Sequence, residues 1–153
     1  MRYRFLALAF VMGLMGCKGS IDHDETSAAK SAFEFARVAF VKRDIENGYA
    51  LLSDSAKRYV SLEKFKEVVF QLHPKAFPKS VTATEYEPVP GDKTIYIYLI
   101  GENSGERFYY RLAMEGTATT GYRVVRLYRG DGPYPPKQKL SKSPVELGSA
   151  LIS

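Results

Sequence analysis

The segment Thr94-Ile-Tyr-Ile-Tyr-Leu-Ile-Gly101 alternates aliphatic and tyrosine side chains, and Glu106-Arg-Phe-Tyr-Tyr-Arg-Leu-Ala-Met-Glu115 follows it after a short loop. A period of two over runs rich in β-branched and aromatic residues predicts β-strands. Two further runs of this composition, 80–89 and 122–129, flank the pair. Because the loops between the four runs are short, neighbouring strands are expected to be antiparallel. The sequence therefore predicts a four-stranded antiparallel meander.

The register of these strands predicts two chemically different sheet faces. We expect the hairpins to close at 89/94, 101/106 and 115/122, and a strand exposes alternate residues on opposite faces. The inner face, expected to lie under helices, then carries Thr84, Tyr86, Pro88, Ile95, Ile97, Leu99, Phe108, Tyr110, Leu112, Met114, Val125 and Leu127. The outer face carries Glu85, Glu87, Tyr96, Tyr98, Arg107, Tyr109, Arg111, Glu115, Tyr122, Arg126 and Tyr128.

The outer face is rich in tyrosine and arginine, the residue types enriched at binding hot spots. Two cross-strand rows are expected, Glu87–Tyr96–Arg111–Arg126 and Glu85–Tyr98–Tyr109–Tyr128. The predicted interaction face consists of Tyr96, Tyr98, Tyr109, Arg111, Arg126 and Tyr128. The alternative is a solvated face held together by cross-strand pairs.

The residues before the sheet follow a helical period. A helix capped by Thr26 or Ser27 is expected to run to about Arg43, and Asp44 is expected to cap a shorter one over 45–52. A third helix should follow Ser61 and end at His73-Pro74, since the residue before proline avoids the helical region. Helices followed by an antiparallel sheet predict an α+β fold with the helices on one sheet face.

Four short motifs carry a family resemblance: Phe33-x-Phe-Ala-Arg37, Arg43-Asp44, Tyr49-Ala-Leu-Leu-Ser53 and Ser61-Leu-Glu-Lys-Phe65. Together they resemble the small secreted or lipid-anchored members of the nuclear transport factor 2-like (cystatin-like) superfamily, over about residues 27–130. The resemblance implies a cone-shaped α+β domain. Enzymes of that superfamily place an acid or base inside the cone, which here would be lined by Tyr86 and Tyr110.

No catalytic residue, metal site or cofactor is predicted. The inner face carries neither a carboxylate nor a histidine, although acid–base catalysis needs such a group within reach. His23 falls in a charged tether with Asp22, Asp24 and Glu25, and His73 is expected to act as a charge partner at a helix end. The alternative is a hydrolase, isomerase or dehydratase that uses Tyr86 or Tyr110 with a carboxylate from Glu34, Asp44 or Glu46.

The first residues have the pattern of a secretory signal. Arg2 and Arg4 precede the apolar run from Phe5 to Gly16, and a basic start before a short apolar stretch is typical of such signals. The run is shorter than the ~20 residues that a membrane-spanning helix needs.

The segment Leu14-Met-Gly-Cys17 contains the only cysteine and resembles a bacterial lipobox. The resemblance implies that residues 1–16 are removed, that Leu14 and Gly16 are recognised, and that Cys17 becomes acylated. In Gram-negative bacteria Lys18, rather than Asp, implies the outer membrane. The alternatives are a plain secretory signal with an incidental cysteine, or an uncleaved anchor. Residues 17–26 would form a lipidated tether, and 131–153 an extended Pro/Lys/Ser-rich tail.

Charge and cysteine content narrow the function classes. A single cysteine excludes an internal disulfide and a Cys-rich zinc site. Removal of residues 1–16 leaves 20 basic against 17 acidic side chains, too small a surplus to indicate nucleic-acid binding. The sequence predicts a non-catalytic envelope lipoprotein that binds either another envelope protein through the outer face or a small apolar ligand in the cone. Its expected partners are the bilayer, through Cys17, and an envelope protein or second copy, through the outer face.

Overall fold

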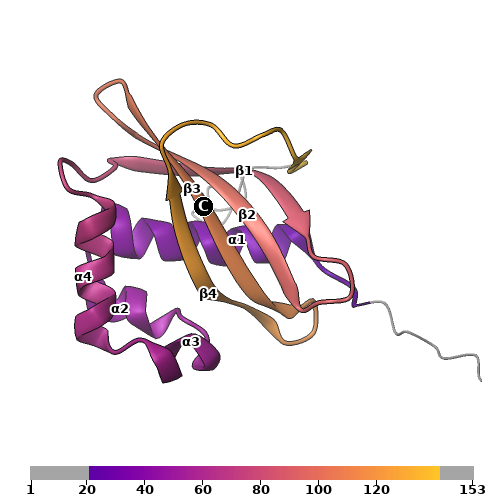
Figure 1. Ribbon diagram of the computed structural model, residues 1–153. Helices are drawn as coiled ribbons and strands as arrows, with labels where there is room; N and C mark the ends of the chain where they lie inside the picture. Colours follow the sequence, from indigo (N-terminus) through magenta and orange to yellow (C-terminus); the bar gives the residue numbers. More distant parts are fainter. Residues whose placement is uncertain (1–20, 142–153) are drawn as a thin grey trace, which may run out of the picture.

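The computed structural model describes residues 21–141, which form helices followed by an antiparallel sheet (Figure 1). The helices are α1 (Glu25–Ala36), continued by the π-helical turn η1 (Arg37–Val41), α2 (Ile45–Ala50), α3 (Asp54–Tyr59) and α4 (Leu62–Leu72). The strands are β1 (Ser80–Pro88), β2 (Thr94–Asn103), β3 (Glu106–Thr117), β4 (Gly121–Gly130) and β5 (Gln138–Lys139). The predicted α+β class is confirmed.

The helix starts follow side-chain caps. The N-cap of α1 is Asp24, whose carboxylate accepts hydrogen bonds from the amide (3.1 Å) and hydroxyl (2.6 Å) of Ser27. The expected caps, Thr26 and Ser27, are therefore wrong by two or three residues. Asp44 and Ser61 cap α2 and α4 as predicted, because their oxygens satisfy amides that a helix start leaves unpaired.

The end of the first helix differs from a regular α-helix. Lys42 donates its amide to Arg37 in the wider π pattern, and Arg43 has a φ of 57° that ends the helix. The wide turn buries three successive residues, Val38, Ala39 and Phe40. Sequence periodicity predicted one continuous helix here, because a π turn leaves no mark on a 3.6-residue pattern.

The sheet has the order β4-β3-β2-β1-β5 and is covered by helices on one face only. Helix α1 crosses behind β1, β2 and β4, while α2, α3 and α4 lie beyond the β4 edge (Figure 1). The core fills the layer between α1 and the sheet. Its largest fully buried side chains are Tyr110, Phe35, Phe40, Phe65, Phe108, Ile95, Ile97, Leu99, Leu112 and Met114.

The β2–β3 hairpin is tighter than predicted. Only Ser104 and Gly105 form its loop, both with positive φ, and the strands close at Asn103 and Glu106. A two-residue turn of this kind follows the twist of its strands. The strands are displaced by two positions from the predicted register, which preserves the faces but changes the partners. Arg111 therefore lies opposite Tyr98, not Tyr96.

Two bulges reverse the faces locally. In β4, Val125 is the extra residue between Val124 and Arg126, so Tyr122 and Val124 turn inward and are buried. The predicted outer position of Tyr122 and inner position of Val125 are wrong, because a bulge shifts the alternation by one residue. In β1, Thr84 is the extra residue, and Ala83 lies inward in its place.

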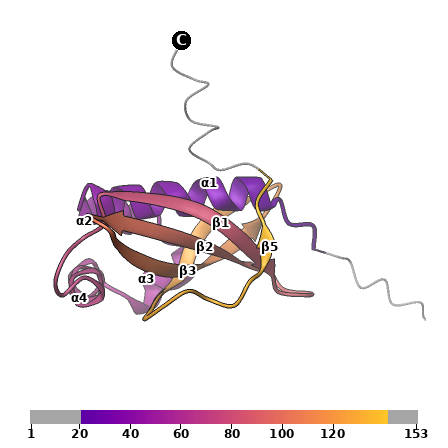
Figure 2. The same ribbon diagram turned by 90° about the horizontal axis from the view of Figure 1, so that it is seen from above.

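A strap, defined here as residues 131–141, crosses the outer face (Figure 2). It carries β5, which pairs with β1 through Glu85–Lys139 and Tyr86–Gln138. The four-stranded meander thus gains a fifth strand. Residues 131–141 of the expected tail are packed against the sheet, whereas residues 142–153 lie outside the described residues.

Candidate functional site

Arg111 lies at the centre of the outer face, within a cage of tyrosine rings that we define as Tyr96, Tyr98, Tyr128 and Tyr134. Its guanidinium carbon is 4.9, 4.5 and 5.7 Å from the ring centroids of Tyr96, Tyr128 and Tyr134, and Tyr98 is its cross-strand neighbour. Such cation–π contacts are favourable within about 6 Å. Within residues 21–141, the Arg111 Nε is buried and has no hydrogen-bond partner, so the rings compensate this charge.

The strap closes the cage. The Tyr134 ring packs edge-on against Tyr98 at 5.3 Å and leaves it only 4% exposed. Lys137 Nζ lies 2.5 Å from the Glu87 carboxylate and holds the strap over the strands. Burial raises the pKa of Tyr98, which keeps the phenol neutral. Half of the predicted interaction face is therefore occupied by the chain itself.

Tyr109 and Arg126, the remaining residues of that face, lie on opposite sides of the cage. Tyr109 pairs with Ile100 beyond it, beside Pro133 and Tyr134 of the strap. Arg126 pairs with Ala113 on the other side, where the strap does not reach. Of the six predicted residues, Tyr98, Tyr109 and Arg111 therefore lie against the strap, whereas Tyr96 and Arg126 line the open part of the face.

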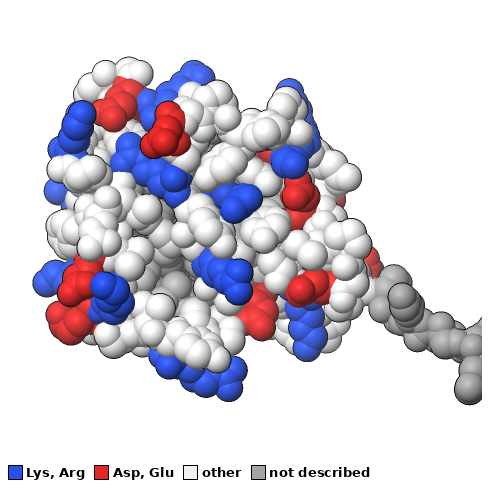
Figure 3. Space-filling model, in the orientation of Figure 1, with Lys and Arg blue, Asp and Glu red and all other residues white. Residues whose placement is uncertain are grey.

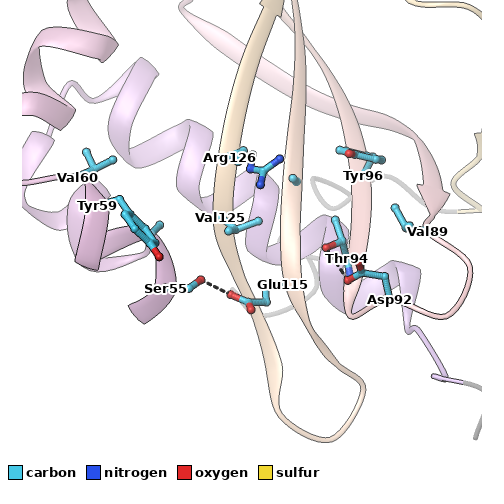
Figure 4. A pocket seen from close by; sticks show the side chains of 12 residues that line it. Ser55, Tyr59, Val60, Val89, Asp92, Thr94, Tyr96, Glu115, Val125 and Arg126 are labelled. Carbon is cyan, nitrogen blue, oxygen red and sulfur yellow. Dashed lines mark hydrogen bonds between the residues drawn. The ribbon is translucent and has the colours of Figure 1, made fainter.

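The open part of the face holds a cleft of about 640 Å³ (Figure 4). Tyr96, Ala113 and Val125 form its floor, with walls from the β1–β2 turn and from α3. Its lining residues are Ser55, Ala56, Tyr59, Val60, Val89, Asp92, Thr94, Tyr96, Ala113, Glu115, Val125 and Arg126. On this side of the molecule, basic side chains lie across the middle, and both basic and acidic side chains lie around the margins (Figure 3).

One end of the cleft carries two fixed carboxylates. Ser55 Oγ donates to Glu115 Oε2 at 2.6 Å, and Asp92 Oδ1 accepts from the amide and hydroxyl of Thr94, both at 3.0 Å. Thr94 and Glu115 are cross-strand partners, which brings the two acids to the same row. No ion pair within residues 21–141 involves Glu115, Asp92 or Arg126.

Tyr59 forms the rim of the cleft on α3. It is 89% exposed, although an aromatic ring of that size normally gains from burial. The sequence did not predict a role for Tyr59. The short helix α3 has no apolar stripe, so neither the helix nor the face on which Tyr59 lies could be inferred from a periodic pattern. The sequence did not predict a role for Tyr134 either, although an aromatic residue among prolines, close in sequence to a tyrosine-rich strand, was a usable signal.

The interior of the predicted cone is filled around Tyr110. Its hydroxyl donates to His73 Nε2 at 2.7 Å, and His73 Nδ1 donates to the Val69 carbonyl at 2.7 Å. Rings of Phe40 and Phe77 lie 4.9 and 4.4 Å from the imidazole. Burial lowers the pKa of His73 and raises that of Tyr110. His73 bonds a carbonyl of the last turn of α4, as a helix-end partner does, but burial disfavours the charged form that the expected role assumed.

The carboxylates of the alternative enzyme hypothesis are engaged elsewhere. Glu34 accepts two hydrogen bonds from Arg37, and Asp44 caps α2, while Glu46 is exposed. Tyr86 is half-buried at the edge of the core. No hydrogen bond within residues 21–141 joins these carboxylates to Tyr86 or Tyr110.

The C-terminal part of the expected tether is docked on the domain. His23 Nε2 donates to the Asp92 carbonyl at 2.9 Å, and its Nδ1 lies 3.3 Å from the Tyr122 hydroxyl. The Asp24 amide donates to that same hydroxyl at 2.8 Å. Around these residues, and throughout residues 21–141, no three His, Cys, Asp or Glu side chains gather as a metal site would need.

The predicted anchor residues Leu14, Gly16 and Cys17 lie outside the described residues, as does the whole expected signal segment, 1–16. Over the part that is described, no helix is long and apolar enough to cross a membrane. Comparison of the chain with protein-family models, with curated protein sequences and with solved structures gave no match in any of the three.

Proposed function

We propose that this chain is a lipid-anchored lipoprotein of the bacterial envelope whose domain is a non-catalytic binding module. The observation that carries the proposal is the open cleft on the outer face. It presents an exposed tyrosine, Tyr59, beside Arg126 and two oriented carboxylates, Glu115 and Asp92. Aromatic and arginine side chains around a depression are typical of protein-recognition surfaces.

The anchor part of the proposal is supported by the basic start, the short apolar run and the Leu14-Met-Gly-Cys17 segment. Two or three acyl chains on Cys17 would hold the domain stably at a membrane, since each buried methylene adds ~0.8 kcal/mol. Lys18 favours the outer membrane in a Gram-negative host.

We also propose that the domain is of the nuclear transport factor 2-like type. The motif residues fall at positions that a shared fold would use: Phe35 and Phe65 are buried in the core, and Asp44 and Ser61 cap helices. Helices that precede and cover one face of an antiparallel sheet agree with this proposal.

Photocross-linking in the native host tests the binding function. The photoreactive residue p-benzoylphenylalanine replaces Tyr59 at the rim of the cleft in the full-length, anchored protein. The matched control replaces Phe70 on α4, which is also an exposed aromatic (48%) and lies outside the cleft. We expect a discrete cross-linked product from position 59 only. Equal labelling from both positions, or none from position 59, would overturn the proposed binding function.

A further inference from the structure

We propose that the cleft binds an extended segment of another protein in which a Lys or Arg lies two positions from an Asp or Glu. The inference rests on the proposed binding function and specifies its partner. It is drawn from the spacing and sign of the charges that line the cleft.

The charges lie in two successive rows of the sheet. Glu115 and Thr94, with Asp92 bonded to Thr94, form the part of one row that lines the cleft, and this part is acidic. Arg123, opposite Glu115 on β4, donates to the Ala50 carbonyl instead and does not line the cleft. Ala113 lies two residues along β3 from Glu115, and its partner on β4 is Arg126. Residues two apart on a strand point to the same face and are ~6.6 Å apart. The cleft thus presents an acidic row and, one row further along the strands (~6.6 Å), a positive position on the neighbouring strand β4.

An extended peptide has this same repeat. Side chains at positions i and i+2 lie on one face of the peptide, ~6.6 Å apart. When a basic side chain of the peptide binds at Glu115, an acidic side chain two positions away in the peptide lies near Arg126. The Arg126 guanidinium can bind that carboxylate through two hydrogen bonds. A cleft of about 640 Å³ is large enough for a short segment of this kind.

The other residues that line the cleft suit the uncharged residue that lies between the two charged residues of the peptide. Ala113 and Val125 give the floor a small apolar centre, and Tyr59 and Tyr96 place rings on either side of it. The carboxylate of Glu115 is held by Ser55, so little side-chain freedom is lost when a cation binds. The acidic row would repel phosphate, which argues against an anionic lipid headgroup as the occupant.

The cross-linked product from position 59 tests the inference when its peptide is sequenced by mass spectrometry. We expect one segment of another protein with a Lys/Arg-x-Asp/Glu pattern, in either chain direction. A second copy of this chain, a glycan, a lipid or a segment without paired charges would overturn the inference while leaving the binding function standing. Failure to form any product at position 59 would contradict the binding function itself, so the two failures are distinguishable.

Two charge variants provide a second readout. Glu115→Gln keeps an acceptor for Ser55 but removes the charge, and Arg126→Gln removes the positive position. Each should lower the cross-linking yield by roughly 5- to 10-fold, as expected for loss of one charge-assisted hydrogen bond. Their matched controls are Glu46→Gln and Arg58→Gln, which are exposed and lie outside the cleft. Yields that are the same in the cleft variants as in these controls would overturn the inference.

Discussion

At the residue scale, hydrogen-bond partners explain where single side chains lie. Tyr122 is turned inward by a bulge, and its hydroxyl accepts the amide of Asp24, the cap of α1. His73 is kept neutral by burial between a carbonyl acceptor and the Tyr110 hydroxyl. Both residues connect a helix terminus to the sheet, and both should therefore affect stability.

The buried His73 should make the folded state pH-dependent. Burial is the main cause of its lowered pKa, so below pH 6.5 the unfolded chain takes up a proton that the folded chain does not. The free energy of unfolding should therefore fall as pH decreases below 6.5, by at most about 1.4 kcal/mol per pH unit from this group. Urea unfolding at pH 7.5 and 5.5 measures the fall. His73→Gln should be less stable at pH 7.5 and show a smaller fall; an equal fall in both proteins would contradict the assignment.

Removal of the Tyr122 hydroxyl should destabilise the domain. Tyr122→Phe leaves the Asp24 amide without its acceptor, and an unpaired, partly buried amide costs about 1–2 kcal/mol. Chemical denaturation measures the difference. Tyr59→Phe is the control, because that ring is 89% exposed and its hydroxyl should change stability by less than about 0.5 kcal/mol. A Tyr122→Phe protein as stable as this control would show that the hydroxyl contributes nothing.

At the scale of elements, the strap decides how much of the outer face is available. Its contacts include the Tyr134 ring, the ion pair to Glu87, the short strand β5, and Leu140, which packs against the core and donates its amide to the Thr84 carbonyl. Half-exposed ion pairs contribute little, so the apolar contacts of Tyr134 with Tyr98 and of Leu140 with the core are the main attachments. The strap also explains why only the end of the face near α3 remains an open cleft.

Truncation of Tyr134 should release the strap without unfolding the sheet. Tyr134→Ala removes the ring that covers Tyr98, whereas Tyr134→Phe keeps it. We expect trypsin to cut after Lys137 and Lys139 roughly 10-fold faster in the alanine variant, because loosely held segments are the preferred sites of nicking. The phenylalanine variant should resemble the wild type. Unchanged cleavage in the alanine variant would mean that β5 and Leu140 retain the strap without the Tyr134 ring.

At the scale of the whole molecule, the two layers have different roles. The inner layer is a filled core, while the outer face carries the cleft, and His23 is docked at the β1–β2 turn beside it. Four residues beyond Cys17 reach Ile21, a span of at most about 14 Å when extended. Under the proposed anchor, this end of the domain therefore lies close to the membrane surface.

Acylation of Cys17 is the prediction that belongs to this scale. Cells that express the full chain and grow with radioactive palmitate should label the wild-type protein and not Cys17→Ser. The serine variant should also leave the membrane fraction, because a hydroxyl cannot carry the thioether-linked lipid. Absence of label from the wild-type protein would contradict the anchor. Equal membrane retention of both proteins would indicate an uncleaved apolar segment instead.

Local patterns in the sequence were sufficient to predict the fold class and most of its elements. The period of two over 94–101 and 106–115 predicted strands, and Asp44 and Ser61 marked helix starts, because alternation and capping depend only on near neighbours. The separation of aliphatic residues from Tyr and Arg was also predicted for most positions. A shift of two residues at the Ser104-Gly105 turn left it intact, since side chains alternate with that same period.

Tertiary contacts decided the remaining features. The bulge at Val125 moved Tyr122 to the inner face, the bulge at Thr84 moved Ala83 inward, and burial made His73 a neutral core residue. The strap covers the tyrosine cage, and residues of α3 form one wall of the cleft beside the cage. These outcomes depend on interaction energies between segments that are far apart in the chain. Examples are the hydrogen bond from the Asp24 amide to Tyr122 and the ion pair of Lys137 with Glu87. The sequence by itself determined the layers and their chemistry, whereas packing between distant segments determined which part of the outer face is open.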